Sequence, residues 1–119
     1  MPREYDLYLE DMLDAVDKIH RYLHGVTRDE LDRDSMRLDA VLRNLEIVGE
    51  AAKNVPLEVR HDWPDVEWRK IAGLRDILTH QYFGIDLDIV WDIVTHKLGE
   101  LRPILVDMLR SSGATEESR

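Results

Sequence analysis

Residues 38–55 read LDAVLRNLEIVGEAAKNV, and this stretch decides the fold. Its apolar side chains recur at alternating steps of three and four residues, at Leu38, Val41, Leu45, Val48, Ala52 and Val55. That spacing is typical of a helix with one buried face. Asp34 or Ser35 can cap the start of this helix. Pro56 marks its end, because the residue before a proline disfavours the helical conformation.

Three further stretches carry a helical stripe: residues 5–23, 68–78 and 87–108. Their apolar positions are Tyr5, Leu9, Met12, Val16, Ile19 and Leu23, then Trp68, Ile71, Leu74 and Leu78, then Leu87, Val90, Trp91, Val94, Leu98, Leu101, Leu105 and Met108. The stripes of the first two helices repeat every seven residues, as packing in a helical bundle requires. No sustained period-two alternation indicates a strand. The sequence therefore predicts an all-α bundle of four to five helices.

The segments between these stripes predict where the helices begin and end. Gly25 can close the first helix in a left-handed conformation. Residues 26–34 are polar and predict a turn, and residues 56–65 predict the main irregular segment, with room for one short helical turn. The third helix should run to about Gly84, and Asp86 is a good cap for the fourth.

The C-terminal part of the chain holds one helix breaker and a polar end. Pro103 lies inside the fourth stripe and should kink or restart that helix. Residues 111–119 read SSGATEESR and predict a frayed tail. We therefore expect a single helical domain over residues 1–110, followed by a polar tail over residues 111–119.

Composition narrows the classes of function. The chain has no cysteine, which excludes disulfides and thiolate metal sites. With no secretion signal and no long apolar run, a soluble, cytoplasmic protein without membrane contact is expected. The net charge of −9 argues against a broad electrostatic grip on nucleic acid. Residues 66–84 nevertheless carry a net charge of +1, so any such chemistry should be local.

Residues 75–82 (RDILTHQY) hold the groups best suited to chemistry. A histidine can give or take a proton at neutral pH, and His80 could act on a ribose 2′-hydroxyl or on the leaving 5′-oxygen. Arg75 offers a planar fork to phosphate oxygens. Tyr82 lies seven residues after Arg75, on the same helical face. These residue types suit RNA cleavage without a metal, although an ordinary salt bridge and a helix-end histidine explain them as well.

The helical spacing does not by itself bring Arg75 and His80 together. Five residues correspond to about 140° around a helix axis and about 7.5 Å along it. The long arginine side chain, a loosening of the helix before Gly84, or a second subunit across a two-fold axis would each allow convergence. The third would bring two arginines and two histidines to one place.

The segment RDILTHQY resembles the R-x4-H-x-Y signature of HepT-like toxins in the HEPN superfamily. The stretches VLRNLEIVGEAA (41–52), WRKIAGLRD (68–76) and YFGIDLDIVWD (82–92) resemble the same family, at corresponding spacings. The resemblance implies an up-and-down, HEPN-like bundle that forms a homodimer, with Arg75 and His80 of both subunits lining a cleft. It further implies metal-independent cleavage of tRNA or mRNA, and no cofactor.

The same resemblance implies a partner. HepT-like toxins pair with an MNT-type nucleotidyltransferase antitoxin, in a type VII-like toxin–antitoxin system. The antitoxin can transfer AMP onto the tyrosine of the motif, here Tyr82. Because Tyr82 shares the face of Arg75, added phosphates would pair with the arginine and occupy the place of the substrate. Simple occlusion by the antitoxin is the alternative mode of silencing.

Five other polar residues are candidates for a role at the site. Arg43 and Asn44 are expected to be auxiliary polar residues; for Arg43, a phosphate contact and an interhelical salt bridge are equally acceptable. Asp76 is expected to orient Arg75 or His80. His20 and His24 have a spacing that can hold a metal, but no third ligand is evident, so no metal is expected. The alternative function is a non-catalytic helical dimer that binds a nucleotide, RNA or its partner.

Overall fold

The computed structural model describes residues 3–74, 76 and 86–117. Within these ranges every regular element is helical. The elements are α1 (Asp6–Leu23), α2 (Arg28–Arg33), α3 (Ser35–Lys53), α4 (Leu57–Asp62), α5 (Trp68–Ala72), α7 (Leu87–Asp92), the π-helical turn η1 (Ile93–Lys97) and α8 (Leu98–Glu117). The all-α prediction is therefore confirmed for the described part of the chain.

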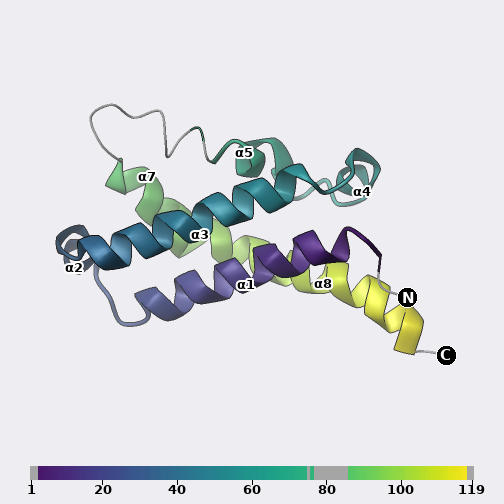
Figure 1. Ribbon diagram of the computed structural model, residues 1–119, viewed down its shortest axis with the longest axis horizontal. Coiled ribbons are helices and arrows are strands. Elements are labelled where there is room, and N and C mark those ends of the chain that lie inside the picture. The colour runs from purple at the N-terminus through teal and green to yellow at the C-terminus, as the bar shows by residue number, and fades with distance from the viewer. Residues whose placement is uncertain (1–2, 75, 77–85, 118–119) are drawn as a thin grey trace.

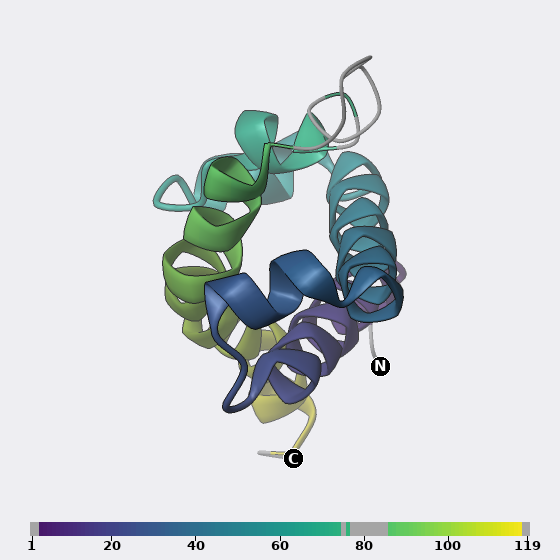
Figure 2. The same cartoon turned by 90° about the vertical axis from the view of Figure 1, so that its left-hand side faces the viewer.

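Three long helical rods build the body of the molecule (Figure 1). Helices α1 and α3 run in opposite directions, and α7, η1 and α8 form one continuous rod antiparallel to α1. Helix α1 packs on both α3 and α8, whereas the short α5 packs on α3. Seen end-on, α5, α3, α1 and the α7–α8 rod are arranged around a common centre (Figure 2).

The predicted stripes form the core. In α3, Val41, Leu45, Val48 and Ala52 are fully buried, and only Leu38 of that stripe is half-exposed. The stripes of α1 and α8 meet them through side chains with at most 6% exposure: Leu9, Met12, Val16 and Ile19 from α1, and Leu98, Leu101, Leu105 and Met108 from α8. Burying each large apolar side chain contributes roughly 1.5–3 kcal/mol, so this layer is a major source of stability.

Three predicted helix boundaries are confirmed. The Asp34 carboxylate accepts a hydrogen bond from the backbone N–H of Arg37 and so caps α3. Asp86 Oδ1 accepts from the N–H groups of Asp88 and Ile89 and caps α7. Gly25 has φ +73°, the left-handed conformation that lets the chain turn after α1.

The structure has more helices than predicted, because residues 26–34 are not a simple turn. With α7, η1 and α8 counted as one, the described residues form six helices. The extra helix α2 begins with a capping box: Thr27 Oγ1 accepts from the N–H of Glu30, and the Glu30 carboxylate accepts from the N–H of Thr27. Helix α4 is the short helical turn expected in residues 56–65.

The later helices also differ from the prediction. Helix α5 stops at Ala72 and Gly73 forms a turn, where an uninterrupted helix was expected. Pro103 does not end α8; a π turn occurs before it, at Ile93–Lys97. Helix α8 continues to Glu117, so most of residues 111–119 is helical rather than frayed. An isolated glycine costs a helix only about 1 kcal/mol, and Gly113 does not stop α8.

Candidate functional site

The structure describes the two flanks of the predicted active segment, but not its centre. Arg75, His80 and Tyr82 lie outside the described residues. Leu74 and Asp76 are described on the N-terminal side, and Asp86 on the C-terminal side. The elements that hold these two flanks define the surroundings of the candidate site.

The N-terminal flank is attached to α3 through α5. Trp68, at the start of α5, is 6% exposed, and its indole N–H donates to the Trp63 carbonyl at 3.1 Å. Leu74 is also 6% exposed and belongs to the core. The exposed Asp76 donates its backbone N–H to the Gly73 carbonyl at 3.1 Å. The chain thus leaves α5 with Leu74 packed inward, directly before Arg75.

The C-terminal flank is fixed by α7. Val90 is 1% exposed and anchors this short helix in the core. Arg28 of α2 forms an ion pair with Asp88 of α7. Together with the Asp86 cap, these contacts hold the first described residues after position 85 against the bundle.

Asn44 is one of two buried polar side chains among the described residues. It is 6% exposed, and its amide N–H donates to the Ala40 carbonyl at 2.9 Å. Its Oδ1 has no hydrogen-bond partner in the described structure. A buried acceptor without a donor costs about 1–3 kcal/mol, so this oxygen suits an N–H donor from a neighbouring group. Asn44 lies one helical turn before Val48, on the same side of α3.

Arg43 is exposed and lies in an acidic setting. It lines a shallow groove of about 340 Å³ between α1 and α3, with Asp11, Glu46 and Glu50 among the other lining residues. Arg43 forms no ion pair in the described structure, so the interhelical salt bridge considered from the sequence is not observed. The neighbouring carboxylates make the electrostatic potential around Arg43 more negative, and this disfavours the binding of a phosphate.

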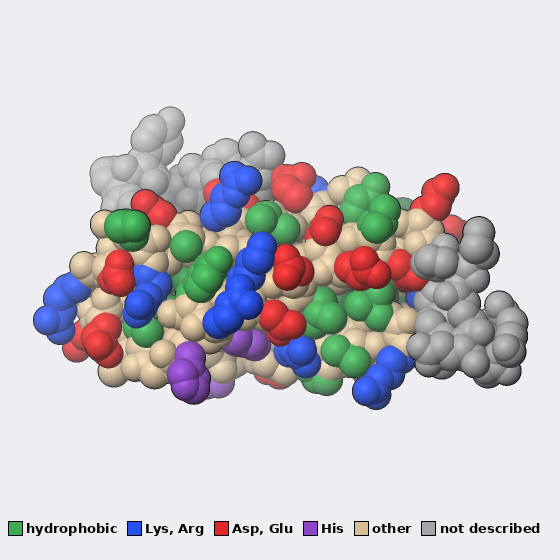
Figure 3. Space-filling model, turned by 60° about the horizontal axis from the view of Figure 1, so that its bottom comes forward, with side chains coloured by type: hydrophobic (Ala, Val, Ile, Leu, Met, Phe, Trp, Pro, Cys, Tyr) green, Lys and Arg blue, Asp and Glu red, His purple; other side chains and the backbone are tan. Residues whose placement is uncertain are grey.

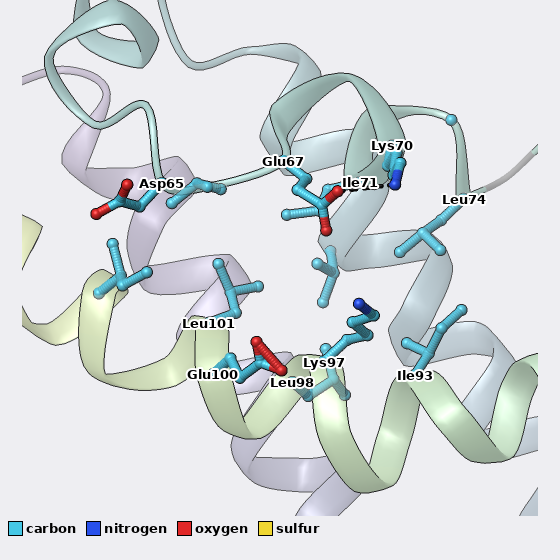
Figure 4. A pocket seen from close by; sticks show the side chains of 14 residues that line it. Asp65, Glu67, Lys70, Ile71, Leu74, Ile93, Lys97, Leu98, Glu100 and Leu101 are labelled. Carbon is cyan, nitrogen blue, oxygen red and sulfur yellow. Dashed lines mark ion pairs between the residues drawn. The ribbon is translucent and has the colours of Figure 1, made fainter.

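A larger cavity of about 490 Å³ lies between α5 and the rod formed by η1 and α8 (Figure 4). Leu74, the residue before Arg75, is part of its wall. Sequence reasoning missed this cavity, because it depends on how α5 and α8 are placed relative to each other. It is termed the α5–α8 groove below.

The described surface has no continuous basic patch on the face around α1 and α8, where acidic and basic side chains are intermixed (Figure 3). No group of three or more potential metal-ligating side chains is found among the described residues. In the described part of the chain, no helix is both long and apolar enough to span a membrane.

The described residues form an all-helical protein, and the sequence carries an R-x4-H segment shortly after α5. The Ribonuclease HepT-like family matches residues 12–108, which includes Arg75, His80 and Tyr82. The chain belongs to the HepT-like ribonuclease family.

Individual relatives agree with this assignment. A protein named "Putative RNase" from Methanocaldococcus jannaschii is 41% identical over 108 residues, which cover 87% of this chain and 85% of the relative. A "Probable ribonuclease HepT" from Thermococcus cleftensis is 35% identical over 102 residues, covering 86% of this chain and 93% of the relative.

A third relative is longer than this chain. The "Gamma-glutamylcyclotransferase and putative RNase" of M. jannaschii is 33% identical over 109 residues, and the match spans 92% of this chain but only 49% of that protein. No solved structure is a significant match to this chain.

Proposed function

We propose that this chain is a metal-independent RNA endonuclease that acts as the toxin of a HEPN/MNT toxin–antitoxin pair. The observation that carries the proposal is the family match over residues 12–108, within which the sequence retains Arg75, His80 and Tyr82 at the R-x4-H-x-Y spacing. The relatives named as ribonucleases support the same activity.

The proposed reaction is a transfer within the RNA strand. The ribose 2′-oxygen attacks the adjacent phosphorus, the bond to the 5′-oxygen breaks, and a 2′,3′-cyclic phosphate forms. His80 takes the proton from the 2′-hydroxyl or supplies one to the leaving 5′-oxygen. Arg75 binds the phosphate oxygens and stabilises the charge that develops on them. DNA lacks the 2′-hydroxyl and would not be cut.

The active form is proposed to be a homodimer, in which both copies of Arg75 and His80 face one cleft. Asn44, with its buried oxygen free in the described structure, suits a role in orienting one of these N–H donors. Asp76 is proposed to orient Arg75 or His80. Arg43 is the weakest of the proposed auxiliary residues, given its acidic neighbours.

Silencing is proposed to occur by AMP transfer onto Tyr82 by an MNT-type nucleotidyltransferase. The modification would place phosphates within reach of Arg75 and compete with tRNA or mRNA. Co-expression with an MNT-type nucleotidyltransferase, followed by mass spectrometry, should show AMP additions that disappear in Tyr82→Phe. Silencing that persists in Tyr82→Phe without any AMP addition would point to occlusion.

The catalytic proposal is tested by incubating the purified, unmodified protein with total RNA in EDTA. Wild type should cleave RNA and leave cyclic phosphate ends, and His80→Ala should lower the rate by about 10²–10⁴-fold, the usual contribution of a general acid or base. His96→Ala is the matched control, because His96 is exposed on η1. Intact RNA with the unmodified wild type, or equal loss in both histidine variants, would refute the proposed chemistry.

A further inference from the structure

The α5–α8 groove has an apolar floor and a charged rim. Eight apolar residues line it: Val48, Val66, Ile71, Leu74, Ile93, Leu98, Leu101 and Ile104. Lys70, Lys97, Asp65, Glu67 and Glu100 stand around its mouth (Figure 4). A cavity of about 490 Å³ with few polar groups at fixed positions has the form of a small-ligand site, which usually measures about 300–1,000 Å³.

One wall of the groove is the π turn. Ile93 and Lys97, its first and last residues, both line the cavity. Such single π turns within α-helices occur frequently at functional sites. The π turn is therefore a second indication, independent of the cavity, that this part of the bundle has a function.

Cations and carboxylates alternate around the rim of the groove. Glu67 accepts a hydrogen bond from Lys70 at 2.8 Å, and this bond, with a smaller contribution from the charge of Lys97, lowers the pKa of Glu67. Lys97 is exposed and forms no ion pair in the described structure. Figure 4 shows Lys97 extending from η1 into the mouth of the groove, with Glu100 beside it and Asp65 toward the other end.

We propose that the α5–α8 groove binds one nucleotide of an RNA strand, with its base against Ile71, Leu98 and Leu101 and its phosphate at Lys97. This inference rests on the proposed ribonuclease function and adds a substrate subsite to it. Leu74 lines the groove and is bonded to Arg75, so a nucleotide held here would lie beside the segment proposed to cut the strand.

The carboxylates predict which bases fit. Asp65 and Glu100 are hydrogen-bond acceptors, and acidic side chains pair with the exocyclic amino group of cytosine. Uracil presents a carbonyl oxygen at the same position and would be repelled. The groove should therefore prefer a base with an exocyclic amino group, and CMP and UMP form a matched pair of probes for this feature.

The test is a titration of the methyl-labelled full chain with CMP and with UMP, followed by NMR. CMP should shift the methyl signals of Ile71, Leu98 and Leu101, with an affinity about tenfold above that of UMP, the order of discrimination one good base contact gives. Glu100→Gln should reduce this preference. Lys97→Glu should weaken CMP binding at least about fivefold through lost phosphate attraction.

Lys18→Glu is the control, because Lys18 is on α1 outside the groove and the substitution changes the net charge equally. Equal weakening in both lysine variants would reduce the effect to overall charge and overturn the subsite. So would the absence of groove shifts with CMP, or groove signals that shift with protein concentration alone, which would identify a second copy as the occupant.

The experiments can refute the proposed subsite and the proposed nuclease activity independently of each other. Cleavage that requires His80, without any response of the groove to CMP and with Lys97→Glu fully active, would leave the ribonuclease standing and refute the subsite. Groove binding of CMP in a protein that leaves RNA intact would retain the subsite and refute the nuclease. If both hold, Lys97→Glu should raise the KM for RNA about fivefold or more with little change in kcat.

Discussion

The two sides of the bundle differ in how closely their helices pack. On one side, α1 is packed against α3 and α8, and the side chains between them are almost wholly buried. On the other side, the five-residue α5 packs on α3 and leaves a cavity of about 490 Å³ toward α8. The residues predicted to carry chemistry follow α5 in the sequence, and Leu74, directly before them, lines this cavity.

This difference separates stability from function. Ligand-binding regions are drawn from the less stable parts of proteins, whereas the closely packed parts supply the free energy of folding. Here the long helices α1, α3 and α8 supply most of the buried core, and the segment proposed to be catalytic lies in the sequence between the short helices α5 and α7. Substitutions on the two sides should therefore have different consequences.

The largest expected effect is a core truncation on the packed side. Leu45 is fully buried in α3, and Leu45→Ala should lower the free energy of unfolding by about 2–5 kcal/mol, since it removes apolar contacts and leaves a closed cavity. Leu101→Ala removes the same atoms from a wall of the α5–α8 groove, where the space joins an existing cavity. Leu101→Ala should therefore lower the free energy of unfolding by only about 2 kcal/mol, the lower end of the usual range.

Urea denaturation gives the free energy of unfolding of both variants and of the wild type. The slope m should be the same in all three proteins, so that the difference reflects stability alone. Equal losses for Leu45→Ala and Leu101→Ala would mean that the two sides are packed alike. A larger loss for Leu101→Ala would place the stability of the fold on the side of the groove and contradict the division drawn above.

A smaller effect is expected at the end of the packed side, where Arg3 joins α1 to α8. The Asp6 carboxylate, 4% exposed as a residue, accepts from the backbone N–H, Nε and Nη2 of Arg3 at 3.0–3.2 Å. Arg3 Nη2 also donates to the Met108 carbonyl at 2.8 Å. Arg3→Ala would leave a buried carboxylate short of donors and should cost about 1.5–3 kcal/mol.

A double-mutant cycle measures the interaction energy between Arg3 and Asp6 apart from the other contacts that each substitution removes. Asp6→Ala introduced into the Arg3→Ala background should cost less than in the wild type, because the carboxylate no longer has an arginine to lose. Thermal or urea unfolding of the four proteins gives the coupling energy. Strictly additive losses would show that Arg3 and Asp6 do not stabilise the protein through their mutual contact.

The packed side could largely be predicted from the sequence. The stripe of α3 and its Asp34 cap follow from local spacing and side-chain chemistry, which the surrounding fold leaves unchanged. Helix α2 was missed because six residues with one buried side chain, Leu31, show no periodicity. Its signal was nevertheless present: Thr27 and Glu30 have the spacing of a capping box.

The open side could be predicted far less well. Lys97 falls on the polar side of the fourth stripe, and only the placement of α5 across from η1 makes it part of a cavity mouth. The end of α5 before Gly73 is likewise not indicated by the apolar stripe, which continues through Leu74. The motif residues Arg75, His80 and Tyr82 were found by their spacing, and their convergence across a dimer stays a prediction.

The smallest effect is expected at the exposed ion pair between α1 and α8. Arg102 Nε donates to Asp17 Oδ1 at 2.6 Å, and Nη2 donates to Oδ2 at 3.3 Å. The hydrogen bond from Arg102 lowers the pKa of Asp17 below its ordinary value. Both side chains are over 40% exposed, so solvent screening makes the contribution of this pair to stability at neutral pH the smallest of those compared here.

The pH dependence of this contribution has a definite sign. Because the folded-state pKa of Asp17 lies below the unfolded-state value of about 3.9, the stabilisation is complete above that value and is lost as the pH falls through the folded-state pKa. Asp17→Asn should therefore destabilise the protein at pH 7 but match the wild type in strong acid. Urea unfolding at both pH values tests this.

Asp14→Asn is the control, because Asp14 pairs with Lys18 within α1 and joins no second helix. A deficit of Asp17→Asn that persists unchanged in strong acid would mean that the aspartate stabilises the contact between α1 and α8 by packing rather than by charge.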